Sequence, residues 1–416
     1  MKIAVEEKKL VMALYCITMF LSMLSIVDNA PFVGLIYNVK YLYMVIITFF
    51  ALYDGILIWN KRIAVGMGLL IIHTILYGVI FTNPRIQSLT NVHFEQLMGI
   101  YILTFFTCIY VYKKDCYLLF LKMSYLALAL FILWCAITHL GAFVNPIYFI
   151  NIFSRTQRFR SHFGMGDVNF CGNYCVYLLL ISFFLWCEWK KKRKMPSIKE
   201  LAVVAGIDFI ALWMLLSTAS RSAILSLVLF FGCYGVLRKR EAIIRNWKLT
   251  LTIVGVLGLI LVVVLFSTGI MADIWLESNR EGNFSINYPI FLQYGDYMNG
   301  MGYMDNSGYL GMAYGYPTTA MDVYFLYIPF STGILGSVLI FSQMIYLLYQ
   351  MLRHGSAEGR DLALSLFVMM LYYAIWQVNY MNYRYYTGII HMVILFFFLM
   401  KINEEKDIHI IKVQRR

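Results

Sequence analysis

Residues 117–138 read YLLFLKMSYLALALFILWCAIT, an apolar run interrupted by one charged side chain, Lys122. The hydrocarbon core of a bilayer is about 30 Å thick, and a helix needs about 20 apolar residues to cross it. Such a run must be helical in lipid, because hydrocarbon offers no partner for backbone N–H and C=O groups. This stretch therefore predicts a transmembrane helix.

Similar runs recur along the whole chain. The 416 residues are 61% hydrophobic and 13% charged, whereas a water-soluble domain has about 25% charged residues. We therefore predict an all-α, polytopic integral membrane protein that forms one transmembrane domain over residues 1–416, with about twelve spans. We place these spans at residues 10–27, 38–59, 63–82, 97–113, 117–138, 170–188, 200–217, 222–237, 249–267, 323–350, 361–379 and 386–401.

The first run has a second interpretation, because Lys2, Lys8 and Lys9 precede its apolar residues as they would in a secretory signal. The run is long for a signal and lacks a small-residue cleavage pattern, so we favour a span.

The net charge of +12 is carried largely by lysine and arginine clusters in the predicted loops. Clusters such as Lys190 to Lys194 and Arg238 to Arg240 fall on one side, the positive-inside pattern. Both termini are therefore predicted to be cytoplasmic, and nucleic acid is not an expected partner.

The cations left on the outer side are nearly all arginine, with Lys40 near a helix end. They are Arg85, Arg155, Arg158, Arg160, Arg221, Arg280 and Arg384. The planar guanidinium binds phosphate or carboxylate through two parallel hydrogen bonds, while lysine acts as a point charge. This bias favours an anionic substrate at the outer face. Chance, or cation–π contacts with outer aromatic rings, is the alternative explanation.

Two predicted outer loops, 139–169 and 268–322, exceed the length of about 12–15 residues above which loops tend to be functional or disordered. The second loop is rich in glycine and aromatic residues. These aromatics include Trp275, Phe284, Tyr288, Phe291, Tyr294, Tyr297, Tyr303, Tyr309, Tyr314 and Tyr316. Aromatic faces with polar tips can pack against sugar rings, but an aromatic belt at the membrane surface has the same composition. Both readings stay open.

Three motifs carry candidate chemistry. The first runs from Arg155 through Arg160, Ser161, His162 and two glycines to Asp167 and Asn169, which can cap the next helix. Helix N-terminal N–H groups also favour anions, so this segment is a candidate anion pocket, although interfacial arginines on lipid phosphate would look alike. The second motif is Ser217-Thr-Ala-Ser-Arg221-Ser. Its arginine is predicted to point into the bundle or a wet cavity, solvated by the Ser/Thr cluster.

The third motif lies in the second long loop. It comprises Glu277-Ser-Asn-Arg280, then Gly300-Met-Gly302, and finally Met321-Asp322-Val-Tyr324 before a span with two glycines. In this order the three motifs resemble the O-antigen polymerase and ligase superfamily, over residues 140–345. Ligases of that superfamily usually carry a His-Asn pair where this chain has Met321-Asp322. The resemblance therefore favours a Wzy-type polysaccharide polymerase, with a ligase or a lipid-linked oligosaccharide flippase as alternatives.

The resemblance implies a metal-independent glycosyl transfer at the outer face of the bacterial cytoplasmic membrane. The donor and acceptor are undecaprenyl-diphosphate-linked oligosaccharides, and further partners are membrane lipids, a chain-length regulator and a flippase. It assigns diphosphate binding to Arg158, Arg160, Arg221 and Arg280, catalysis to Arg280 and Asp322, and glycan binding to Tyr303 and Tyr324. No cofactor is expected, and the seven histidines show no metal-ligand spacing.

The topology is testable by cysteine labelling at Ser197 and Ser278. The lysine and arginine distribution places Ser197 in the cytoplasm and Ser278 outside. In intact cells a membrane-impermeant maleimide should label Ser278→Cys and not Ser197→Cys until the membrane is opened. Labelling of Ser197→Cys from outside would overturn this orientation.

Overall fold

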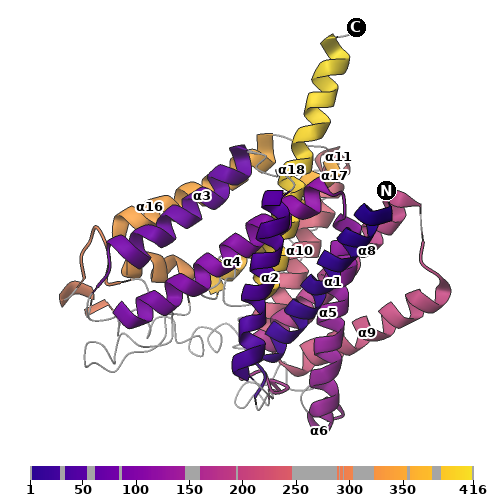
Figure 1. The fold of residues 1–416 in the computed structure, drawn as a ribbon, viewed down its shortest axis with the longest axis horizontal. Coiled ribbons are helices and arrows are strands. Elements are labelled where there is room, and N and C mark those ends of the chain that lie inside the picture. The colour runs from indigo at the N-terminus through magenta and orange to yellow at the C-terminus, as the bar shows by residue number, and fades with distance from the viewer. Residues whose placement is uncertain are drawn as a thin grey trace. The chain divides into compact units, whose positions relative to one another are not determined.

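The computed structural model describes residues 2–28, 33–53, 61–83, 87–145, 160–193, 195–245, 288–289, 291–293, 295–302, 323–353, 357–376 and 386–414. Regular structure in these residues is helical, apart from one isolated bridge between Asp296 and Gly300, so the all-α class is confirmed there (Figure 1). The helices are α1 (Lys2–Leu24), α2 (Val33–Tyr53), α3 (Lys61–Ile75), η1 (Leu76–Ile80), α4 (Gln87–Lys113), α5 (Tyr117–Thr138), α6 (Leu140–Phe143), α8 (Val168–Lys192), α9 (Ile198–Ser217), α10 (Arg221–Arg238), α11 (Arg240–Arg245), α16 (Tyr324–Arg353), α17 (Ala357–Trp376) and α18 (Tyr386–Gln414).

Several of these helices can cross a membrane. By length and composition the described residues contain 5 such helices, namely Tyr117–Thr138, Val168–Lys192, Ile198–Ser217, Arg221–Arg238 and Tyr324–Leu352. Shorter apolar helices cover Val39–Phe50, Ala64–Ile80, Leu97–Lys113 and Tyr386–Lys401. These helices support a membrane protein. The predicted span 249–267 lies outside the described residues, and the number of twelve spans stays a prediction.

Contacts group the chain into two compact units. Unit 1 consists of Met1–Met67, Gln96–Val228 and Met381–Met400, and unit 2 consists of Gly68–Glu95, Leu229–Tyr380 and Lys401–Arg416. Because α4 contributes residues to both units, the boundary does not follow helix ends. Each unit is described below by itself.

Helices α1, α5 and α8 form the centre of unit 1. Helix α1 packs against α2 and α5, while α8 packs against α5 and α9. The Tyr15 ring of α1 packs against Tyr43 and Phe120, and its hydroxyl lies 3.1 Å from the Ser124 hydroxyl of α5. Because lipid tails are as apolar as leucine, close packing and interhelical hydrogen bonds of this kind must hold the helices together.

A carboxylate within α9 also joins helices of unit 1. The Asp208 carboxylate accepts hydrogen bonds from the hydroxyls of Tyr125, at 3.1 Å, and Ser182, at 2.5 Å. Asp208 therefore links α9 to α5 and α8, which is a structural use of a polar side chain within a span.

Unit 2 contains α16, which packs against α17. Helix α16 carries Pro329 and is broken at Gly333, where φ is 62° and ψ is −159°. The preceding part of the unit includes η1, a π-helical turn that continues α3. Such turns are rare and frequently occur at functional sites.

Candidate functional site

The first two sequence motifs meet in unit 1. The Ser161 N–H donates to the Ser217 carbonyl at the end of α9, at 3.3 Å. The Ser220 hydroxyl donates to the Asn169 side-chain oxygen in the first turn of α8, at 2.8 Å. Ser222 also donates to this oxygen, at 3.4 Å. We call Asn169, Ser220 and Ser222 the amide–serine cluster. It joins segments that are far apart in the sequence.

The turn before α8 has glycine at two positions where the backbone φ is positive. Gly164 and Gly166 have positive φ, 77° and 70°, which glycine adopts without steric cost. A side chain at Gly164 would overlap the His139 ring. The side chains of Phe163 and Met165 are buried and anchor the turn, and the Gly164 carbonyl accepts a hydrogen bond from the Asp28 N–H at 2.6 Å. The turn is thus fixed against the end of α1.

Two helix N-termini lie next to one another at this cluster. Asp167 caps α8, as predicted, by accepting the Asn169 N–H at 2.8 Å. Ser220 accepts the Ala223 N–H at 3.4 Å at the start of α10. The helices approach closely because Gly172 has no side chain; a Cβ there would lie 2.7 Å from the Cβ of Ala223. Two N-termini together favour negative charge nearby.

The predicted arginines Arg160 and Arg221 belong to the segments that meet here. Arg160 directly precedes Ser161, and Arg221 is the first residue of α10, between the two serines of the cluster. Both arginines are partly exposed. The nearby His162 is exposed, with its Nδ1 3.9 Å from the Asp28 carboxylate. The two segments joined by the amide–serine cluster thus each carry a guanidinium group, a group suited to binding phosphate.

The hydroxyls of the α9–α10 turn hydrogen-bond to backbone and to Asn169, and their predicted solvation of Arg221 stays a prediction. The Ser217 and Thr218 hydroxyls donate to the carbonyls of Trp213 and Leu215, at 2.9 and 2.7 Å. They cap the last turn of α9, and the serines that follow bind Asn169. The Asn169 contact was missed because nothing local to either motif identifies its partner.

The remaining predicted site residues are placed as follows. Arg158, Arg280, Tyr303 and Asp322 lie outside the described residues. Tyr324 begins α16 in unit 2, and its ring is buried with its centroid 6.3 Å from that of Tyr327. The roles of all five residues stay predictions.

Residues 295–302, which belong to the predicted second long loop, pair with the break in α16. A helix broken at Gly333 leaves backbone groups on both sides without intrahelical partners, which lipid cannot satisfy. Residues 295–302 supply partners for them. The Met301 and Gly302 N–H groups donate to the carbonyls of Phe330 and Ser331, at 2.8 and 3.1 Å. Beyond the break, the N–H groups of Ile334 and Leu335 donate to the carbonyls of Tyr297 and Met298, at 2.9 and 3.2 Å.

This backbone pairing requires glycine at Gly300 and Gly333. A Cβ at Gly333 would lie 2.5 Å from the Met298 carbonyl carbon, and one at Gly300 would collide with the backbone of Ser331. Both glycines also have positive φ. The sequence showed both glycine motifs, but no residue in either motif indicated that they pair.

Helix α3 and its π-helical extension support the break. The His73 Nε2 lies 3.4 Å from the Thr332 hydroxyl, and a Cβ at Gly336 would lie 2.9 Å from the Tyr77 ring. The Asn83 side-chain amide donates to the Met301 carbonyl at 2.6 Å. Sequence reasoning missed these residues, since one polar side chain in or beside an apolar run is a weak signal.

Aromatic rings and a carboxylate surround the paired loop. The Phe291 ring packs against Tyr297 and Phe330, with centroids 5.4 and 5.0 Å away. Tyr297 is 60% exposed and Tyr288 is 40% exposed. The Met298 N–H and the Asn299 side-chain amide bind the Asp296 carboxylate, at 2.8 and 2.9 Å, and lower its pKa. The Asp296 carboxylate can accept hydrogen bonds from sugar hydroxyls, and the exposed Tyr297 ring beside it can pack against the sugar ring.

The pairing predicts a specific effect of Gly333→Ala. The new Cβ meets the Met298 backbone, so the loop must withdraw from α16, at a cost of about 1–3 kcal/mol. Hydrogen exchange of peptides covering 295–302 should become faster by roughly tenfold or more. Gly68→Ala in α3 is the control, because its Cβ would meet nothing within 4 Å. Unchanged protection in Gly333→Ala would contradict the pairing.

A scan against protein-family models found no match to this chain, and a search of curated proteins found none either. The function is therefore inferred from the residues and their geometry.

Proposed function

We propose that this protein is a polysaccharide polymerase. It transfers a growing glycan from undecaprenyl diphosphate to the next lipid-linked repeat unit at the outer face of the bacterial cytoplasmic membrane, in capsule, exopolysaccharide or O-antigen synthesis. The observation that carries the proposal is the meeting of the two arginine motifs through Ser220 and Asn169.

The chemistry requires stabilisation of a leaving group. As the bond between the glycan and the diphosphate breaks, negative charge accumulates on the diphosphate. Preorganised donors and fixed positive charge lower the barrier most when they are aimed at developing charge. In the proposal Arg160 and Arg221, on the two segments joined by Ser220 and Asn169, supply both the positive charge and the N–H donors. Arginine is suited to this role because its planar guanidinium can hydrogen-bond to two phosphate oxygens at once.

The acceptor hydroxyl must also lose a proton. Asp296 is poorly suited as the base, because hydrogen bonds from Met298 and Asn299 hold its pKa below the ordinary value and weaken its basicity. It is better suited to accept a hydrogen bond from a sugar hydroxyl beside Tyr297. Asp322 keeps the role of proton acceptor in the proposal, and Arg158, Arg280, Tyr303 and Tyr324 keep the roles implied by the resemblance.

The alternatives are an O-antigen ligase and a flippase. Met321-Asp322 in place of His-Asn disfavours the ligase. A flippase is expected to keep charged residues available along a path through its spans. Asp208, the carboxylate within α9, instead accepts hydrogen bonds from Tyr125 and Ser182, which disfavours a role for it on a transport path. A chain-length regulator and a flippase remain the proposed partners of the polymerase.

Complementation of a deletion strain tests the proposal. Without the gene, single repeat units should accumulate on the lipid carrier at the outer face. The wild-type gene should restore long polymer. Arg160→Lys and Arg221→Lys should lose most of the polymer at normal protein level, because lysine keeps the positive charge but cannot form the two parallel hydrogen bonds of a guanidinium. Polymer length on gels and the carrier-linked glycan by mass spectrometry provide the readouts.

Arg238→Lys is the matched control, since Arg238 ends the helix that Arg221 begins and should be replaceable. Full polymer from both Arg160→Lys and Arg221→Lys would remove these arginines from the mechanism. Accumulation of finished polymer on the carrier in the deletion strain would indicate a ligase. Single units confined to the cytoplasmic face would indicate a flippase.

A further inference from the structure

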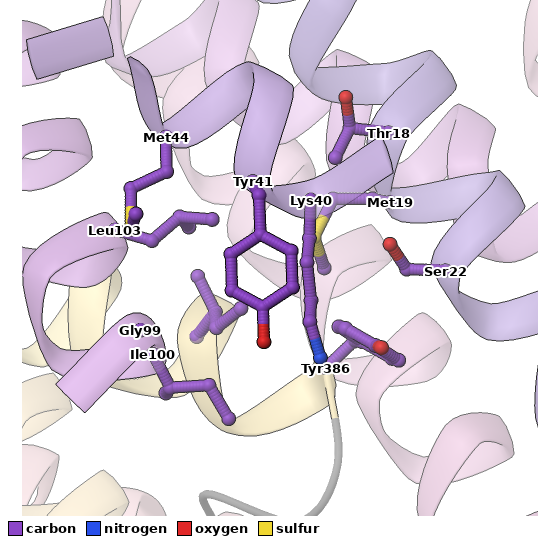
Figure 2. A pocket seen from close by; sticks show the side chains of 11 residues that line it. Thr18, Met19, Ser22, Lys40, Tyr41, Met44, Gly99, Ile100, Leu103 and Tyr386 are labelled. Carbon is purple, nitrogen blue, oxygen red and sulfur yellow. The ribbon is translucent and has the colours of Figure 1, made fainter. Parts of the chain in front are cut away.

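Unit 1 contains a large cleft between α9 and its neighbours α5 and α8. Its free volume is about 560 Å³, within the range of about 300–1,000 Å³ that is typical of ligand pockets. A second cavity of the unit, beside Lys40 and Tyr41, has a free volume of about 20 Å³, enough for one water (Figure 2). The lining of the larger cavity includes Lys122 of α5, Trp189 of α8 and Lys199 of α9. We call it the α9 cleft.

The cleft exists because α9 meets its neighbours only along part of its length. Asp208, about three turns into α9, accepts the hydrogen bonds from Tyr125 and Ser182. The residues at the start of the helix, 197–203, are all exposed, with Ile198 at 86% and Val203 at 61%. Figure 1 shows the start of α9 apart from α8. Because Val203 also lines the cleft, apolar surface of α9 is bare on the side that faces α5 and α8.

The cleft lies where three possible spans begin or end. Helices α5, α8 and α9 are each long and apolar enough to cross a membrane. Lys122 is in the second turn of α5, Trp189 in the last turn of α8 and Lys199 in the first turn of α9. At about 1.5 Å per residue, the lining reaches about 10 Å from these helix ends, into the headgroup region and the start of the hydrocarbon core. The charge pattern of the sequence predicts that this end is cytoplasmic.

The open end of the cleft has an excess of positive charge. Lys122 and Lys199 both line it, and neither forms an ion pair among the described residues. Glu200 offsets part of this charge and interacts electrostatically with Lys122. Its carboxylate is also used locally, since it accepts hydrogen bonds from the Ser197 N–H and hydroxyl, at 2.8 and 3.1 Å, in the cap of α9. The last turn of α8 adds three more lysines. This end of the cleft therefore favours an anion.

The deeper walls of the cleft are apolar. They are formed by Leu185 of α8 and by Val203 and Val204 of α9. Tyr125 and Trp189 also line the cleft, and these two residue types are enriched at the boundary between headgroups and hydrocarbon. Water against apolar walls is unfavourable, so hydrocarbon should fill this part. A matching ligand has a negative headgroup and an acyl chain.

We infer that the α9 cleft binds one anionic phospholipid of the surrounding membrane, with its phosphate near Lys122 and Lys199 and an acyl chain against Leu185 and Val203. Basic pockets between transmembrane helices at the cytoplasmic side bind anionic headgroups in other membrane proteins. The lipid fills the space beside the start of α9 and supports it. This site lies at the opposite end of α9 from Ser217 and does not depend on the proposed polymerase activity.

Native mass spectrometry of the purified full-length protein in detergent tests the inference, with phosphatidylglycerol as the probe. The wild type should bind one copy more tightly than phosphatidylcholine with the same acyl chains. Lys122→Met and Lys199→Met should each weaken phosphatidylglycerol binding by about fivefold, and together by about 25-fold, because each removes one cation near a lipid headgroup. Both lysines are exposed, so the variants should fold. Lys239→Met, an exposed lysine between α10 and α11, is the matched control and should bind normally.

A bulky substitution tests the apolar part of the cleft without changing its charge. Val203→Trp should occupy the space of the acyl chain and weaken phosphatidylglycerol binding by about tenfold. Unchanged affinity in this variant would place the lipid outside the cleft. Equal binding of the two lipids, or an equal loss in Lys239→Met, would overturn an anionic-lipid site at these lysines. Displacement of phosphatidylglycerol by an equal concentration of inorganic phosphate would identify a free-phosphate site and overturn the lipid.

Discussion

The lack of hydrogen-bond partners in hydrocarbon is the constraint on which the rest of this structure depends. It explains why the described chain is almost entirely helical, and why the break at Gly333 must be matched by another backbone segment. Residues 295–302 meet that requirement on both sides of the break. In this way residues 295–302 become part of the α16 structure, and Tyr297 and Asp296 acquire a fixed position in unit 2.

The same constraint shapes unit 1, where polar side chains pair across helices. Asp208 joins three helices, and Asn169 accepts hydrogen bonds from Ser220 and Ser222. The second set brings together the starts of two helices and the segments that carry Arg160 and Arg221. Some buried hydroxyls of unit 1, Ser22 among them, find no hydrogen-bond partner among the described residues.

Local features of the sequence predicted local features of the structure. The apolar run 117–138 is a helix with those bounds, Asp167 caps α8, and a tight turn separates α9 from α10. Each follows from residues within a few positions of one another. The contacts of Asn169 with Ser220, of Gly300 with the α16 backbone and of His73 with Thr332 were not predicted. They join residues far apart in sequence, and neither hydropathy nor capping rules specify such partners.

The most direct test of the central claim is reconstitution of the purified protein in liposomes, with a single lipid-linked repeat unit as the only substrate. The proposed reaction uses this substrate as both donor and acceptor. It should therefore produce a ladder of longer lipid-linked glycans, with one free undecaprenyl diphosphate for each bond formed. Movement of intact repeat units between leaflets without any ladder would contradict the proposal that Arg160 and Arg221 serve glycosyl transfer.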